Sequence, residues 1–178
     1  RVRPYGLVTG LEAEKGKLAR EVHMDAGEVW TQAKYHEMNV RYQSQAVEQL
    51  NALASKDEPF FLQYWPLYPL NFVYDQEQQK SRNGGYMAEK MELLDEWRGE
   101  FCAAVDATGK ADNTIVVLMA DNGIFNYYSP NSGMMELIYR GGKTQHLEGG
   151  VRTDAFVRWP GVIPAGSAAG DSIHVSDL

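Results

Sequence analysis

The sequence predicts an α/β fold in which a layered sheet is flanked by helices. Two long segments carry apolar residues at helical spacing, and short runs of β-branched and aromatic residues alternate with them. Together they give the order helix, strand, helix, strand, loop and strand, which is typical of an α/β layered sheet. The chain has 178 residues, of which 44% are hydrophobic, so it is long enough to form one domain or part of one.

The first expected elements are a surface excursion, a helix and a strand. Residues 1–27 are polar and interrupted by glycines, so we expect them to lie outside the α/β core portion, which is predicted to span 28–178. A helical pattern runs over about residues 29–55, with apolar side chains on one face. A polar turn then leads into residues 60–64, whose apolar composition predicts a buried strand.

A long loop and a second helix follow. Residues 70–85 are polar and glycine-containing and predict a loop, whereas an amphipathic pattern from 87 to 107 predicts a helix that ends at Thr108 and Gly109. Cys102 lies within that pattern, so we interpret it as a half-buried helix residue. Because it is the single cysteine, the chain forms no internal disulfide.

The next predicted strand ends in a corner that carries oxygen donors. Residues 114–119 are an unbroken apolar run, typical of a strand covered on both faces in a parallel sheet, and such sheets carry their sites at the carboxyl ends of the strands. Asp121, Asn122 and Gly123 follow. Carboxylate and carboxamide oxygens are hard donors that calcium or magnesium prefers. The same residue types are common in turns, so the corner alone leaves both interpretations open.

A second candidate segment, residues 141–152, has a pair of glycines on each side of Lys143. Glycine pairs allow positive φ and the close approach of main-chain amides to a ligand, and the lysine presents a compact positive charge to an anion such as sulfate or phosphate. A glycine-rich surface loop with a solvated lysine is the alternative. Glu148 and Arg152 are expected to form an ion pair that holds the segment's shape. Residues 124–140 predict an irregular rim loop, and 155–159 predict a final strand.

Taken together, these segments resemble the later part of the catalytic domain of the sulfatases, the arylsulfatase family. The resemblance rests on ADNTIVVLMADNG and GGKTQHLEGGVRTDAFVRWPG within residues 111–161, and on shorter matches in the same order at 58–62, 94–99 and 176–178. It implies that residues 1–178 form part of a sulfatase catalytic domain with an alkaline-phosphatase-like α/β fold, incomplete here. It also implies a hydrolase that cleaves sulfuric esters with a divalent metal.

Residue by residue, the resemblance implies a metal site and a sulfate site. Asp121 and Asn122 would bind the divalent cation, which is calcium, with magnesium as the alternative. Lys143 would be the catalytic residue that contacts the sulfate group. Phosphatase relatives on the same architecture commonly have a His for zinc at the place of Asn122, so the carboxamide favours calcium and sulfate ester chemistry.

The sequence also departs from the family pattern. Where sulfatases commonly carry a sulfate-contacting His after the strand predicted at 60–64, this chain has Leu70 or Asn71, of which only Asn71 is able to donate a side-chain hydrogen bond. His146 lies near Lys143, and a substrate contact and an ordinary exposed histidine are both open for it. The family's nucleophile is a formylglycine made within Cys/Ser-x-Pro-x-Arg, and that motif and two early metal-binding aspartates are absent. We therefore expect the later half of a catalytic domain, inactive by itself.

Composition limits the partners. The balance of 17 basic and 24 acidic residues gives a net charge of -7, which argues against nucleic acid and against an anionic membrane surface as partners. No apolar stretch approaches the ~20 residues that a membrane helix needs. The expected substrate is a small-molecule or carbohydrate sulfate ester, and the resemblance implies a periplasmic or secreted location.

Two other functions stay open at this point. One is a phosphatase or phosphonate monoester hydrolase on the same scaffold, which a preference for zinc and phosphate esters would indicate. The other is a non-catalytic remnant that binds a metal and an anion, which binding without turnover in the complete gene product would indicate.

Overall fold

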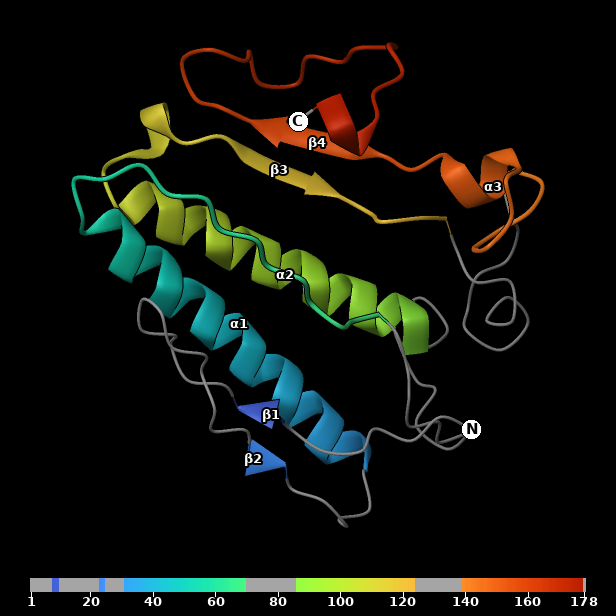
Figure 1. Ribbon diagram of the computed structural model, residues 1–178, viewed down its shortest axis with the longest axis horizontal. Helices are drawn as coiled ribbons and strands as arrows, with labels where there is room; N and C mark the ends of the chain where they lie inside the picture. Colours follow the sequence, from blue (N-terminus) through green and yellow to red (C-terminus); the bar gives the residue numbers. More distant parts are fainter. Residues whose placement is uncertain (1–7, 10–22, 25–30, 70–85, 124–138, 178) are drawn as a thin grey trace, which may run out of the picture.

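Two long helices lie side by side and contain the core of the part of the chain that the structure describes (Figure 1). The computed structural model describes residues 8–9, 23–24, 31–69, 86–123 and 139–177. Helix α1 spans Gln32–Ala54 and helix α2 spans Tyr86–Ala107, close to the predicted bounds. The hydroxyl of Thr31 accepts a hydrogen bond from the backbone nitrogen of Lys34 at 3.2 Å and caps the start of α1.

The two helices bury residues that recur at helical spacing. Ala46, Leu50 and Ala54 are buried on α1, as the apolar pattern predicts, and the buried residues of α2 include Trp97. Because these positions recur about once per turn, they form a continuous stripe. A polar side chain, Gln43, is buried within the stripe, and its Nε2 donates to the carbonyl oxygen of Trp97 at 3.0 Å. The amide nitrogen is therefore satisfied inside the core.

An aromatic cluster joins the segment after α1 to both helices. Tyr68 is buried, with its ring edge-on to Tyr35 at a centroid distance of 5.5 Å and stacked on Trp97 at 5.7 Å. Its hydroxyl is hydrogen-bonded to Nδ1 of His36 at 3.0 Å, and the ammonium of Lys90 lies 5.4 Å from its ring centroid. Burial and the positive charge of Lys90 lower the pKa of His36. These contacts anchor the end of the segment on the helix pair.

The prediction of a strand at residues 60–64 is wrong. The segment runs along α2 (Figure 1) and pairs with no strand in the described part of the chain. Its side chains still alternate, because Tyr64 is half-buried and stacks on Phe101 at 6.1 Å, whereas Phe61 is 84% exposed. A strand needs a neighbouring backbone for its hydrogen bonds, and apolar composition alone does not supply one.

The sheet beside the candidate site is a two-stranded antiparallel ladder. Strand β3, Val116–Met119, pairs with strand β4, Ala155–Arg158, and both lie within predicted ranges. The antiparallel pairing corrects the expected parallel arrangement of neighbouring strands. Ile115 is 53% exposed and Val117 38% exposed, so the expected burial of the apolar run on both faces is not found either. Apolar composition favours burial, but the layers that pack on a strand decide whether burial occurs.

The remaining elements are short. Strand β1, Val8–Thr9, pairs antiparallel with β2, His23–Met24, within the region predicted to be a surface excursion. A 3₁₀ turn, η4, spans Val175–Asp177. None of the helices in the described ranges combines the length and the hydropathy that crossing a lipid bilayer requires.

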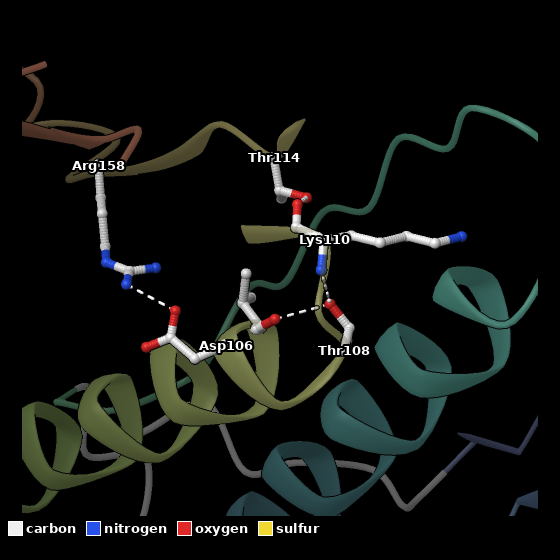
Figure 2. Close-up of polar contacts among 6 residues, drawn as sticks. Asp106, Thr108, Lys110, Thr114 and Arg158 are labelled. Carbon is white, nitrogen blue, oxygen red and sulfur yellow. Dashed lines mark hydrogen bonds and ion pairs between the residues drawn. The ribbon is translucent and has the colours of Figure 1, made fainter. Parts of the chain in front are cut away.

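Helix α2 ends where the sequence predicts, and a set of polar contacts defines the turn (Figure 2). The hydroxyl of Thr108 donates to the carbonyl oxygen of Val105 at 2.7 Å and accepts from the backbone nitrogen of Lys110 at 3.2 Å. The chain then makes the 3₁₀ turn η2, Ala111–Asn113, and the hydroxyl of Thr114 donates back to the carbonyl oxygen of Lys110 at 2.7 Å. These contacts fix the direction in which the chain leaves α2 and enters β3.

Two further contacts tie β4 to the same turn. Nη2 of Arg158 lies 2.7 Å from Oδ1 of Asp106 on α2, as Figure 2 shows. Nε1 of Trp159 donates to the carbonyl oxygen of Asp112 at 2.8 Å. One end of the β3–β4 pair is thus attached to α2, and the carboxyl end of β3 points away from this attachment toward α3 (Figure 1).

Candidate functional site

The corner after β3 presents two oxygen-bearing side chains. Asp121 is exposed and Asn122 is half-buried. Nδ2 of Asn122 donates to Oδ1 of Asp121 at 3.0 Å and to the carbonyl oxygen of Gly123 at 3.3 Å. These hydrogen bonds use the amide nitrogen of Asn122. Within the described ranges, its carboxamide oxygen and the second carboxylate oxygen of Asp121 accept no hydrogen bond and are open to a cation. Two hard oxygens of this kind fit calcium or magnesium.

The lysine loop, defined here as residues 139–152, folds back on itself. Lys143 is half-buried in a tight turn in which the backbone nitrogen of Gln145 donates to the carbonyl oxygen of Gly142 at 3.0 Å. The side chain of Gln145 closes the turn, because its Oε1 accepts from the backbone nitrogen of Gly142 at 3.0 Å. Gly141 has a φ of 88°, which confirms the unusual backbone conformation for one glycine of the first pair, and Thr144 also has a positive φ, 74°.

Helix α3, Glu148–Val151, brings the lysine loop against the corner (Figure 1). The backbone nitrogen of Gly123 donates to the carbonyl oxygen of Gly150 at 2.9 Å. A Cβ atom on Gly123 would overlap the carbonyl oxygen of Gly149, so the two segments touch through their backbones. Asp121, Asn122 and Lys143 therefore lie on two backbone segments in direct contact.

The second glycine pair has a different role from the one that the sequence predicts. Gly149 and Gly150 lie inside α3 and do not have a positive φ. Their role is to leave space where a side chain would not fit. A Cβ on Gly150 would overlap the carbonyl oxygen of Gln145, and one on Gly149 would overlap the carbonyl oxygen of Gly141. Their close approach is to other backbone groups of this chain. Residue spacing alone misses these contacts, because they depend on how the lysine loop folds back on itself.

The predicted ion pair between Glu148 and Arg152 is confirmed. Nη1 of Arg152 lies 3.4 Å from Oε2 of Glu148, and both side chains are exposed. The guanidinium also lies over the ring of Tyr139, 4.8 Å from its centroid. Arg152, at one end of the lysine loop, thus contacts Tyr139 at the other end, and Tyr139 is a participant that the sequence pattern did not indicate.

The other predicted site residues have different positions. His146 is exposed in the lysine loop, and Asn71 lies outside the described residues, as do the predicted loop at 70–85 and residues 124–138 of the rim loop predicted at 124–140. Cys102 is half-buried on α2, which agrees with a structural role. The described residues contain no group of three or more His, Cys, Asp or Glu side chains placed to hold a metal. Within those ranges, the corner's donors are one carboxylate and one carboxamide.

Comparison with known proteins places these two loops in a family. The family model described as Sulfatase matches residues 7–178. The chain is 36% identical to the steryl-sulfatase of Rattus norvegicus over 118 residues, which are 63% of this chain and 20% of that protein. It is 30% identical to the arylsulfatase A of Homo sapiens over 130 residues, which are 72% of this chain and 25% of that protein. The chain thus spans about a fifth to a quarter of the length of these relatives.

A solved structure shares the fold. The crystal structure of Ps i-CgsB in complex with k-i-k-neocarrahexaose matches with a TM-score of 0.59 and 23% identity, over 85% of this chain and 31% of that chain. This likeness confirms the predicted α/β alkaline-phosphatase-like fold. Because the family model matches nearly all of the sequence, including both the Asp-Asn-Gly corner and the lysine loop, the chain belongs to the sulfatase family.

Proposed function

We propose that the protein that contains this chain is a sulfuric ester hydrolase that cleaves an aryl or carbohydrate sulfate ester. Membership in the sulfatase family supports the reaction. Relatives named steryl-sulfatase and N-acetylgalactosamine-6-sulfatase support ester substrates of small molecules and of carbohydrates. The observation that carries the proposal is the hydrogen bond between Gly123 and Gly150, because it sets the oxygen donors and the lysine loop side by side.

Asp121 and Asn122 are the proposed calcium ligands in this chain. The oxygens that accept no hydrogen bond from a described residue are hard donors, and the exposed position of Asp121 leaves room for further ligands. A calcium ion bound by these residues would withdraw negative charge from a sulfate oxygen. The amide nitrogen of Asn122 holds Oδ1 of Asp121 in place and thereby orients the carboxylate.

Lys143 is the proposed catalytic cation. The turn from Gly142 to Gln145 holds its backbone, and its ammonium stabilises the negative charge that develops on the ester or leaving-group oxygen. The chain as a whole has a net charge of -7, so attraction of a sulfate ester depends on this local positive charge and on the cation.

Turnover also needs groups that this sequence does not contain. We assign the nucleophile to a formylglycine in a Cys/Ser-x-Pro-x-Arg segment joined to this chain.

We also propose that the intact protein is located in the periplasm or outside the cell. Fractionation of the native cells tests the location, since recovery of the protein with a cytoplasmic marker would contradict it.

The decisive experiment replaces Lys143 in the protein that carries the formylglycine segment. Lys143→Ala is expected to lower kcat for an aryl sulfate by about 10²–10³-fold, the usual cost of losing one group that stabilises transition-state charge. Lys56→Ala is the matched control, because Lys56 is an exposed lysine at the end of α1. Unchanged turnover in Lys143→Ala would remove the role assigned to this residue.

Metal dependence separates calcium from zinc chemistry. Asp121→Ala is expected to weaken calcium binding by about tenfold or more, measured by calorimetry, because a charged ligand is lost. Chelation should abolish sulfate ester cleavage, and calcium should restore it.

Parallel assays with an aryl phosphate test the two alternative functions. A zinc-loaded protein that prefers phosphate would indicate the phosphatase alternative, and calcium binding without any turnover would indicate the non-catalytic one.

A further inference from the structure

We propose that Gly123, Gly149 and Gly150 are positioning residues that couple the Asp-Asn-Gly corner to the lysine loop, so that a change in one is transmitted to the other. The inference rests on the proposed function for the identity of the two ligands, a cation at the corner and an anion at Lys143. The mechanical part of the coupling depends on the backbone contacts alone.

The first step of the coupling is the contact between the corner and α3. The nitrogen of Gly123 donates to the carbonyl oxygen of Gly150 at 2.9 Å, and Gly123 has no space for a Cβ against the carbonyl of Gly149. Backbone groups packed this closely have no flexible side chain between them to absorb a displacement. A shift of the corner therefore moves α3.

The second step is the contact between α3 and the turn that carries Lys143. Gly150 lies against the carbonyl oxygens of Gln145 and Gly142, which are the two ends of that turn. The nitrogen of Gly149 donates to the carbonyl oxygen of Arg140 at 2.8 Å, which fixes the other side of the lysine loop. A continuous path of backbone contacts thus leads from the residue after Asn122 to the residues on each side of Lys143.

One side-chain contact runs beside this path, because the exposed hydroxyl of Thr153, which follows the lysine loop, donates to the carbonyl oxygen of Ala120 at 3.4 Å. In the described ranges, Asp121 and Asn122 hydrogen-bond only to each other and to Gly123. The Glu148–Arg152 pair is exposed and closes the lysine loop without touching the corner. The Thr153 contact is long and exposed, so the closer glycine contacts carry most of the coupling. The coupling predicts that a cation at the corner orders the lysine loop and that an anion at Lys143 strengthens cation binding by the same factor.

Amide hydrogen exchange of the full 178-residue chain tests the mechanical part without any ligand. Gly123→Ala forces the corner away from α3 and should accelerate exchange at Gln145, Gly149 and Gly150 by at least about tenfold, as expected for local opening. Gly99→Ala is the matched control, because a Cβ at Gly99 meets nothing within 4 Å. Amides near the buried residues Leu50 and Val105 report global unfolding and should stay unchanged.

A second variant tests the opposite direction. Gln145→Ala removes the hydrogen bond from Gly142 to an exposed side chain, so it is compatible with folding. It should accelerate exchange of the Gly123 amide, which lies on the far side of α3. The coupling is overturned if exchange of the lysine-loop amides is unchanged in Gly123→Ala and exchange of the Gly123 amide is unchanged in Gln145→Ala.

Calcium ions alone are the probe for the ligand part. Calcium is added to the longer protein that carries the formylglycine segment, because two metal-binding aspartates of the family are absent from residues 1–178. It should slow exchange at Gly149 and Gly150 in the wild-type protein, and this slowing should disappear in Gly123→Ala. If both variants open the neighbouring segment but calcium changes no amide at the corner, the coupling stands and the calcium assignment of the proposed function fails. If calcium protects the corner amides but never the lysine loop, the assignment stands and the coupling fails.

Discussion

Tyr64 and Tyr68 lie on the same segment, and their hydroxyl groups differ in hydrogen bonding. Burial raises the pKa of each to about 12, with the negative charge of Glu89 adding to the effect at Tyr68. The hydroxyl of Tyr68 is hydrogen-bonded to His36 at 3.0 Å. The hydroxyl of Tyr64 is buried without a hydrogen-bond partner among the described residues. A comparison of the two residues therefore separates the stabilisation that a hydrogen-bonded hydroxyl provides from the free-energy cost of burying a hydroxyl without a partner.

Removing each hydroxyl should give opposite results. Tyr68→Phe is expected to lower the free energy of unfolding by about 1 kcal/mol, because it deletes a hydrogen bond in a buried cluster. Tyr64→Phe should leave it unchanged or raise it, since no partner is lost and a buried polar atom is removed. Urea denaturation of the 178-residue chain measures both, and equal losses in the two variants would contradict this account.

At the scale of elements, the helix pair and the β3–β4 pair are held by different forces. Helices α1 and α2 share a buried stripe in which Leu50 is 2% exposed and Val105 is 1% exposed. The β3–β4 pair is attached to α2 by polar contacts such as the one between Arg158 and Asp106, whose side chains are partly exposed. Exposed ion pairs contribute little to stability, so the helix pair dominates the stability of the described part.

Substitutions in the two elements should differ accordingly. Leu50→Ala is expected to lower the free energy of unfolding by about 2–5 kcal/mol, because it removes a fully buried side chain and leaves a cavity. Asp106→Ala is expected to lower it by less than about 1 kcal/mol. Denaturant midpoints of the two variants decide the matter, and a larger loss for Asp106→Ala would show that the β3–β4 pair controls stability.

At the scale of the whole molecule, large apolar side chains are exposed on several segments outside the helix stripe. Phe61 is 84% exposed, Trp65 68% and Phe156 63%. Such side chains favour association between molecules when they are not covered. The predictions of a buried strand at 60–64 and of two-sided burial at 114–119 both assumed covering layers, and the exposure of Phe61 and of Val117 shows that the described residues do not supply them.

The exposed side chains should govern the behaviour of the isolated chain in solution. The double substitution Phe61→Ser and Trp65→Ser is expected to reduce self-association of the 178-residue chain without lowering its unfolding free energy by more than about 1 kcal/mol, because neither side chain contributes a buried contact of comparable size. Sedimentation velocity and urea denaturation provide the two measurements. Unchanged association, or a loss as large as that of Leu50→Ala, would contradict the prediction.

Local patterns predict what depends on neighbouring residues. The bounds of α1 and α2 follow from apolar spacing, and the end of α2 follows from Thr108 and Gly109, because helix formation and helix termination are decided within a few residues. The same holds for Asp121, Asn122 and Lys143 as candidates, since their residue types and flanking glycines specify the chemistry that they offer. The resemblance of these two loops to sulfatases is equally a property of the sequence.

Contacts between distant residues are decided only by the tertiary structure. The antiparallel pairing of β3 with β4, the unpaired segment at 60–64 and the role of Tyr139 beneath Arg152 all depend on which segments meet in space. The approach of Gly123 to Gly149 and Gly150 belongs to the same class. A sequence names the groups that are able to bind a cation or an anion, whereas their meeting point depends on packing between segments that the chain separates widely.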